Sequence, residues 1–195
     1  MNLTPYIHTR SGDPDFVDLD WAEPILDWTT DRLVDMPSGI HRHPVVFVAY
    51  REGIYAIKEL PVRLARHEFD MLRAMEDETR HMARAVGLVE RPWLQPDVEA
   101  SGAIITRFVR HAFPYRELVL DLGFGHRRDA LLDAFAGLLV ELHLAGFYWG
   151  DCSLSNILYR WDASSIEAVM IDAETSRIFE ELSAGQRNED LAIME

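Results

Sequence analysis

The chain is 195 residues long, enough for one domain or for two small lobes that share a cleft. Hydrophobic residues make up 48% of it, so it can bury a sizeable core, and extensive disorder is excluded. Its 33 acidic and 19 basic residues give a net charge of −14. This balance argues against nucleic acid as a partner, because phosphate neutralisation needs an excess of basic side chains.

The cysteine content and the termini indicate the compartment. One cysteine, Cys152, excludes an internal disulfide and fits a reducing environment. The N-terminal sequence MNLTPYIHTRSGDPDF has neither the basic start nor the apolar run of a secretory signal. No apolar run approaches the roughly 20 residues that span a bilayer. We therefore expect a cytoplasmic protein without a membrane span.

The first half of the chain predicts a small antiparallel sheet. PVVFVAY and GIYAIKEL are rich in β-branched and aromatic residues and flank the turn Arg51–Gly53, which is typical of a hairpin. The elements expected, in chain order, are an N-terminal arm at 1–19, a short helix after Pro24, strands at 44–50 and 53–60, a helix at 62–84, and strands at 85–92 and 102–109.

The second half begins with the clearest helix of the chain, at residues 127–146. Gly146 is its expected C-terminal stop. Its apolar residues recur at helical spacing and predict a buried stripe of Leu131, Leu132, Phe135, Leu138, Leu139 and Leu142. Two short strands, 156–160 and 167–174, and a polar, helical tail complete the chain.

This order predicts an α+β fold with two lobes. After the arm at 1–19, a small lobe with an antiparallel sheet and a hinge is expected at 20–110. A shortened, mainly helical lobe is expected at 111–195, with a polar loop and a strand hairpin.

Lys58 and Glu68 each occupy a position where a charge needs an explanation. Strand alternation places Lys58 on one face with Ile54 and Ala56, so its ammonium lies either at an edge of the sheet or in a cleft. Glu68 falls within the apolar stripe of the following helix, unless it lies at the wet margin of that stripe. A buried carboxylate is costly without a cation, and Lys58 is the expected partner.

A second group of polar residues surrounds the C-terminal hairpin. Asp151 and Asn156 lie five positions apart in YWGDCSLSNILYR, and Asp172 follows the second strand. If Tyr159 pairs near Val169, Asn156 and Asp172 lie opposite each other at the open end of the hairpin. Side-chain oxygens of this kind suit Mg²⁺. Ordinary turn chemistry, in which Asp and Asn are common, is the alternative.

Taken together, these motifs resemble those of protein-kinase-like phosphotransferases, in particular the bacterial lipopolysaccharide kinase and aminoglycoside phosphotransferase groups. AIK, with Lys58, resembles the strand motif whose lysine holds the α- and β-phosphates, and Glu68 resembles its helix partner. LHLAGFYWGDCSLSNIL resembles the long helix that leads into the catalytic loop, and IDAE resembles the metal-binding segment.

This resemblance implies ATP and Mg²⁺ as cofactors and assigns a role to each site residue. Asp151 is the expected catalytic residue, with Lys58 and Glu68, and Asn156 and Asp172 are the expected metal ligands. The nucleotide is expected to contact Ala56, Lys58, Thr106, Arg107, Phe108 and Val109, of which the last four form the hinge. In place of a glycine motif, the backbone around Gly39 and the Arg42 side chain are expected to cover the phosphates, and the alternative is that PSGIHRHP is a plain surface turn.

The sequence departs from the family pattern in several places. No GxGxxG precedes the lysine, and Trp149 stands where related loops often have a histidine. Glu174 replaces the usual glycine of the metal motif, where it could serve as an extra metal ligand or cap the tail. The chain also continues only briefly beyond Asp172, which indicates either a fragment or a minimal domain. We therefore expect exposed apolar surface on the large lobe, or a partner or further segment that covers it.

Three functions remain open from the sequence. The first is ATP- and Mg²⁺-dependent phosphoryl transfer to an unidentified hydroxyl acceptor. The second is a nucleotide-binding pseudokinase with a sensor or scaffold role, which the missing glycine motif favours. The third is an interaction module that binds no nucleotide, against which the retained charged residues argue.

Overall fold

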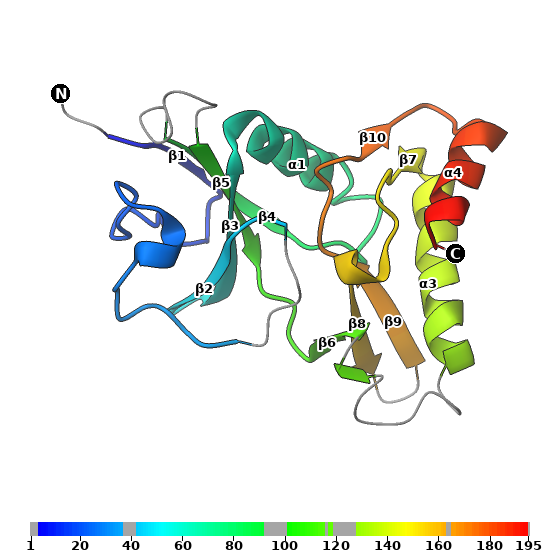
Figure 1. Cartoon of the computed structure of the whole chain (residues 1–195), viewed down its shortest axis with the longest axis horizontal. Coiled ribbons are helices and arrows are strands. Elements are labelled where there is room, and N and C mark those ends of the chain that lie inside the picture. Colours follow the sequence, from blue (N-terminus) through cyan, green and yellow to red (C-terminus); the bar gives the residue numbers. More distant parts are fainter. Residues whose placement is uncertain are drawn as a thin grey trace. The chain divides into compact units, whose positions relative to one another are not determined.

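The computed structural model describes residues 4–36, 42–91, 101–115, 117–118, 128–162 and 165–194 (Figure 1). The chain forms two compact units. The first comprises Met1–Asp70 and Arg84–Phe108, and the second comprises Met71–Ala83 and Val109–Glu195.

The first unit contains a five-stranded antiparallel sheet with the order β1-β4-β5-β3-β2. The hairpin predicted from sequence is confirmed, because β2 pairs with β3 from Val45↔Lys58 to Tyr50↔Gly53. The strands are β1 (Tyr6–Thr9), β2 (Val45–Tyr50), β3 (Gly53–Pro61), β4 (Ala85–Arg91) and β5 (Ser101–Arg107).

The two faces of β3 have different neighbours, as its alternating pattern predicts. Tyr55 and Ile57 are fully buried in the core that the sheet shares with the N-terminal segment. That segment contributes Phe16, Leu19, Trp21, Ile25 and Trp28, and its single 3₁₀ turn at Ile25–Asp27 replaces the short helix expected after Pro24. Lys58 lies on the opposite face of β3, toward helix α1.

Helix α1 (Val62–Ala74) ends ten residues earlier than predicted. Beyond α1, turns begin at Met75 and are followed by extended backbone. The extended backbone forms because His81 and Ala83 hydrogen-bond to strand β9 (Ser165–Met170). Ala83 N donates to Met170 O over 2.8 Å, and Met170 N donates to His81 O over 2.9 Å. These contacts satisfy the backbone outside a helix, which apolar periodicity alone does not predict.

Within the described residues, the second unit combines small antiparallel sheets with helices (Figure 1). A three-stranded antiparallel sheet has the order β6-β8-β9, and β10 pairs with β7. The remaining elements are β6 (Ala112–Pro114), α3 (Arg128–Leu144), β7 (Phe147–Tyr148), the 3₁₀ turn η2 (Leu154–Asn156), β8 (Ile157–Asp162), β10 (Arg177–Ile178) and α4 (Ala184–Met194).

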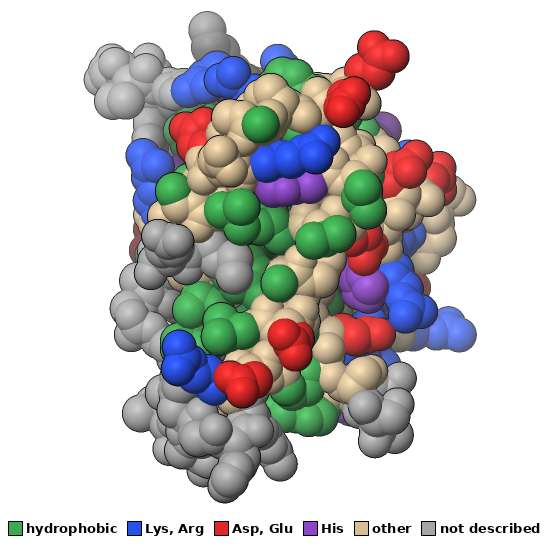
Figure 2. Space-filling model, turned by 90° about the vertical axis from the view of Figure 1, so that its right-hand side faces the viewer, with side chains coloured by type: hydrophobic (Ala, Val, Ile, Leu, Met, Phe, Trp, Pro, Cys, Tyr) green, Lys and Arg blue, Asp and Glu red, His purple; other side chains and the backbone are tan. Residues whose placement is uncertain are grey.

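Helix α3 buries five of the six residues predicted for its stripe, and Leu132 is the exception, with 39% of its surface exposed. Leu132, Val140 and Leu144 instead form an outward apolar row at spacings of eight and four residues, which lie on one face of a helix. Figure 2 shows exposed hydrophobic side chains interspersed with charged and polar ones. The apolar surface expected on the large lobe is therefore present. None of the helices within the described residues is long and apolar enough to cross a membrane.

Gly146 is required where α3 turns into β7. Its φ is +74°, and an added Cβ would lie 2.1 Å from the backbone oxygen of Phe179. We expect Gly146→Ala to destabilise the protein by about 2 kcal/mol or more. Gly137, within α3, is the matched control, because a Cβ there meets nothing within 4 Å. Gly137→Ala should stabilise the helix by about 1 kcal/mol.

Chemical unfolding of the two alanine variants beside the wild type measures both effects. The free energy of unfolding should fall in Gly146→Ala and rise in Gly137→Ala. A lower stability of Gly137→Ala, or an unchanged stability of Gly146→Ala, would contradict the conclusion that the turn requires glycine at position 146.

Candidate active site

The predicted pair of Lys58 and Glu68 forms in the first unit. The Lys58 Nζ lies 3.1 Å from the Glu68 Oε2, and the two side chains are 14% and 1% exposed. Strand β3 supplies the lysine and helix α1 the glutamate, so the pair joins a strand to the helix that covers it. This geometry excludes the two alternatives, namely that Lys58 lies at an edge of the sheet and that Glu68 lies at the solvent-exposed border of the apolar stripe. A buried carboxylate with this partner holds the ammonium in a fixed position.

The predicted nucleotide-binding residues of the first unit lie around the same strand. Ala56 pairs with Thr106 across β3 and β5, so these two residues are direct neighbours. Arg42 lies in a bend shortly before β2, and Gly39 lies outside the described residues. The nucleotide contacts of these positions remain predictions.

The backbone of the predicted hinge already has internal hydrogen bonds. Arg107 N donates to Arg84 O over 2.9 Å, and Phe108 N donates to Ile54 O over 3.0 Å. The Arg107 guanidinium binds the buried carboxylate of Asp13 over 3.2 Å. Within the described residues, the backbone N–H groups of Arg107 and Phe108 are already used, which favours Val109 as the predicted donor to a nucleotide. The Arg107 side chain has a structural role, because it binds Asp13.

The second unit brings Asp151 and Asn156 together. Asn156 Nδ2 donates to the Asp151 backbone oxygen over 3.1 Å and to its Oδ2 over 3.0 Å. The 3₁₀ turn η2 brings the asparagine back toward the aspartate. Because the amide nitrogen faces Asp151, the Asn156 Oδ1 remains oriented for a different partner, and an amide oxygen is a suitable ligand for Mg²⁺.

Asp172 follows β9, but the predicted hairpin register was wrong by one residue. Tyr159 pairs with Ala168, and Asn156 O accepts a hydrogen bond from Ile171 N over 3.0 Å. The register follows from the hairpin's tight connection, since Asp162 pairs with Ser165 and only two residues lie between them. Ser155, rather than Asn156, therefore comes opposite Asp172.

The Asp172 carboxylate also shapes the segment that follows it. Its Oδ1 accepts the backbone N–H of Glu174 over 3.1 Å, which forms a local turn. Asn156 and Asp172 carry amide and carboxylate oxygens of the kind that Mg²⁺ prefers, and their role as its ligands remains a prediction. Glu174 is half-buried at the same turn.

Trp149 packs inside the second unit, on the loop that carries Asp151. Its side chain is fully buried and packs edge-on against Phe135, with ring centroids 6.1 Å apart. Its Nε1 donates to the Asp172 backbone oxygen over 3.2 Å. The buried indole therefore ties the loop that carries Asp151 to the segment that carries Asp172.

Asp190 is the residue that the sequence reasoning missed. It lies on α4, is fully buried, and accepts hydrogen bonds from Trp149 N over 3.0 Å and from Gly150 N over 2.8 Å. Its Oδ2 also lies 2.9 Å from His143 Nε2. Gly150 has a φ of +78°, so its backbone takes a form that favours glycine. The tail helix thus fixes the backbone directly before Asp151.

Cys152 has no features of a nucleophile. Its thiol is fully buried, and burial, with the nearby charges of Asp190 and Asp151, raises its pKa to about 12. The thiol is therefore protonated at neutral pH. We expect iodoacetamide to label the native protein slowly and the unfolded protein fast, as followed by mass spectrometry. Rapid labelling of the native protein at pH 7 would contradict this description of the loop.

Comparison with known proteins identifies the class of fold to which the chain belongs. The structure is similar to a solved structure described as "WaaP in complex with acyl carrier protein", with a TM-score of 0.60 and 20% sequence identity. The similarity covers 84% of this chain and 68% of that chain. At this identity the match shows the fold alone, and that fold is kinase-like.

The family follows from the sequence. A model of the lipopolysaccharide kinase (Kdo/WaaP) family matches residues 50–195. The chain therefore belongs to this family of kinase-like phosphotransferases, which confirms the resemblance drawn from its motifs. No curated protein matches the sequence.

Proposed function

We propose that the protein is an ATP- and Mg²⁺-dependent phosphotransferase that acts on a hydroxyl group of a saccharide. One observation carries the proposal. Asn156 donates to both the backbone and the carboxylate of Asp151, so one amide orients the expected base and keeps its own oxygen for a different partner, such as a metal. Family membership supports the reaction class, and the family's name supports a saccharide as the acceptor.

Each residue of the site has a role in this proposal. Lys58, held by Glu68, binds the α- and β-phosphates of ATP. Asn156 and Asp172 hold magnesium, which neutralises charge on the phosphate oxygens. Asp151 orients the acceptor hydroxyl and takes its proton as the hydroxyl oxygen bonds to the γ-phosphorus. The bond between that phosphorus and the β,γ-bridging oxygen breaks, and ADP leaves.

Transfer of labelled γ-phosphate tests the proposal. The protein is incubated with labelled ATP, magnesium and a lipopolysaccharide core-sugar preparation, beside Asp151→Ala and Asp172→Ala. Labelled saccharide should form only with the wild-type protein, because one variant lacks the base and the other a metal ligand. If both variants labelled the saccharide as strongly as the wild-type protein does, the assigned roles of Asp151 and Asp172 would be contradicted.

A nucleotide-binding pseudokinase is the second candidate, favoured by the absence of a GxGxxG motif before Lys58. It predicts a thermal shift with ATP and magnesium but no transfer and no slow ATP hydrolysis. The same assay therefore separates the two functions, provided that binding is measured in parallel.

A further inference from the structure

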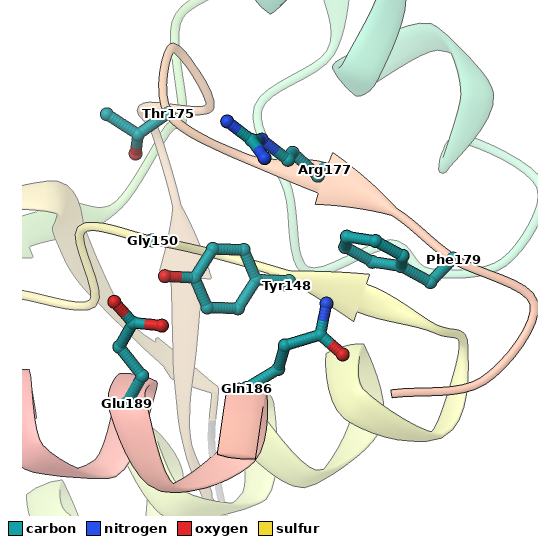
Figure 3. Close-up of a pocket in the computed structure, with 7 residues that line it drawn as sticks. All are labelled: Tyr148, Gly150, Thr175, Arg177, Phe179, Gln186 and Glu189. Carbon is teal, nitrogen blue, oxygen red and sulfur yellow. The ribbon is translucent and has the colours of Figure 1, made fainter. Parts of the chain in front are cut away.

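A pocket of about 360 Å³ lies within the second unit, beside the catalytic loop (Figure 3). Strand β7 contributes Tyr148, β10 contributes Arg177, and α4 contributes Gln186 and Glu189. Its volume is at the lower end of the range for small-molecule sites. The pocket is formed by one compact unit, so its walls belong to a single packed body.

The pocket wall is bonded to the loop that carries Asp151. Gly150, the residue before Asp151, lines the pocket, and so does Thr175. Thr175 Oγ1 donates to Trp149 O over 3.0 Å, and Ser176 Oγ donates to the same oxygen over 3.1 Å. A ligand in this pocket would therefore lie against the backbone that positions the expected catalytic aspartate.

The charges of the pocket balance. Figure 3 shows the Tyr148 ring between Arg177 on one side and Glu189 on the other. Burial and a hydrogen bond to Glu189 raise the pKa of Tyr148, so its hydroxyl is neutral and donates to that carboxylate. A phosphate dianion would meet one guanidinium and face a carboxylate, and a cation would face the guanidinium. This balance disfavours both kinds of strongly charged ligand.

The remaining features suit a ligand with several hydroxyl groups. Arg177 and the Gln186 amide nitrogen can donate hydrogen bonds, and Glu189 and the Thr175 hydroxyl can accept them. The rings of Tyr148 and Phe179 add flat apolar surface. Adjacent donors and acceptors around aromatic surface match a sugar ring, whose hydroxyls donate and accept while its C–H groups pack on the aromatic rings.

We propose that this pocket is the acceptor subsite and that Arg177, Glu189 and Tyr148 orient a sugar ring beside the catalytic loop. The inference rests on the proposed function for the identity of the reaction. Binding of the sugar itself needs neither nucleotide nor metal, so it can be measured separately from phosphoryl transfer.

Protein-observed NMR of the ¹⁵N-labelled chain, without ATP, tests the pocket. The sugar-derived probes are methyl α-D-mannoside and D-glucose, and inorganic phosphate is the charged comparison. We expect at least one of the two sugars to shift the amide signals of Gly150, Thr175 and Gln186, with a Kd on the order of 1–10 mM for so small a ligand. Phosphate should leave these signals in place. Absence of shifts with every sugar-derived probe, or stronger binding of phosphate, would overturn the proposal.

Three variants complete the test. Glu189→Gln and Arg177→Gln should each weaken sugar binding about 10-fold, because each removes a hydrogen bond to a charged group. Both side chains are exposed, so the fold should persist. Asn188→Ala, on the same helix but outside the pocket lining, is the control and should bind normally.

The affinity for magnesium-ATP, measured by calorimetry, should be the same in all three variants. Unchanged sugar binding in the two pocket variants, or an equal loss of ATP binding, would overturn the assignment. If sugar binds as expected but no phosphate is transferred, the assignment of the pocket as a sugar-binding site is supported and the proposed phosphotransferase reaction is rejected.

Discussion

Glu68→Gln is expected to lower phosphoryl transfer about 100-fold and to destabilise the protein by about 3–5 kcal/mol. The Glu68 carboxylate is 1% exposed and lies 3.1 Å from the Lys58 ammonium. An amide of the same shape removes the countercharge and leaves the lysine buried without it, which accounts for the loss of stability. The loss of activity follows because the ammonium that should meet the phosphates is no longer held. Transfer assays and denaturant unfolding measure the two effects.

A matched control uses an exposed ion pair between α1 and the sheet. Arg66 and Glu90 lie 2.6 Å apart, but Arg66 is 57% exposed. Glu90→Gln should leave activity and the unfolding midpoint close to wild type, because solvent screens this pair. Equal effects of the two glutamine variants would show that the buried pair has no special role.

A double variant separates function from folding. In Lys58→Met/Glu68→Leu, two apolar side chains replace the ion pair, which should restore most of the stability lost in Glu68→Gln. Activity should stay absent, since no ammonium remains. Recovery of transfer together with stability would contradict the assigned role of Lys58.

Asp190→Asn is expected to lower transfer about 100-fold and to cost about 3 kcal/mol of stability. The carboxylate accepts the backbone N–H groups of Trp149 and Gly150 and contacts His143. An asparagine has one acceptor oxygen, so at least one buried donor loses its partner. The loop before Asp151 should then move, and a shift of about 1 Å is enough for a loss of this size.

Glu181→Gln is the control for the same region. Glu181 is 88% exposed, and its contact with Arg187 is 4.0 Å long, so the change should have little effect. The kcat and the melting temperature of Glu181→Gln should be close to those of the wild type. An Asp190→Asn protein with normal kcat would show that α4 does not position the catalytic loop.

Those parts of the site that depend on local pattern could be predicted from the sequence. Alternation along β3 and the helical stripe of α1 placed Lys58 opposite Glu68, and the five-residue spacing placed Asn156 near Asp151. The hairpin register was missed by one residue, because the turn between β8 and β9 is tighter than its polar sequence suggested.

Contacts between distant segments could not be predicted in this way. Asp190 is one of several acidic residues in the polar tail, and it accepts a hydrogen bond from the loop before Asp151. The spacing of these acidic residues does not distinguish Asp190 from the others. Glu59 likewise forms a second buried ion pair, with Arg91 at 2.7 Å, and accepts Ile25 N over 2.8 Å. That pair anchors the N-terminal segment, so burial of an ion pair does not by itself identify a catalytic one.

The central proposal is that the protein binds magnesium-ATP, and calorimetry tests it most directly. ATP, GTP and AMP are titrated with and without magnesium into the wild type and Asp172→Ala. We predict saturable ATP binding that depends on magnesium and is lost in the variant, because Asp172 supplies a metal ligand. No heat of binding with ATP, or the same affinity without magnesium and in Asp172→Ala, would contradict it.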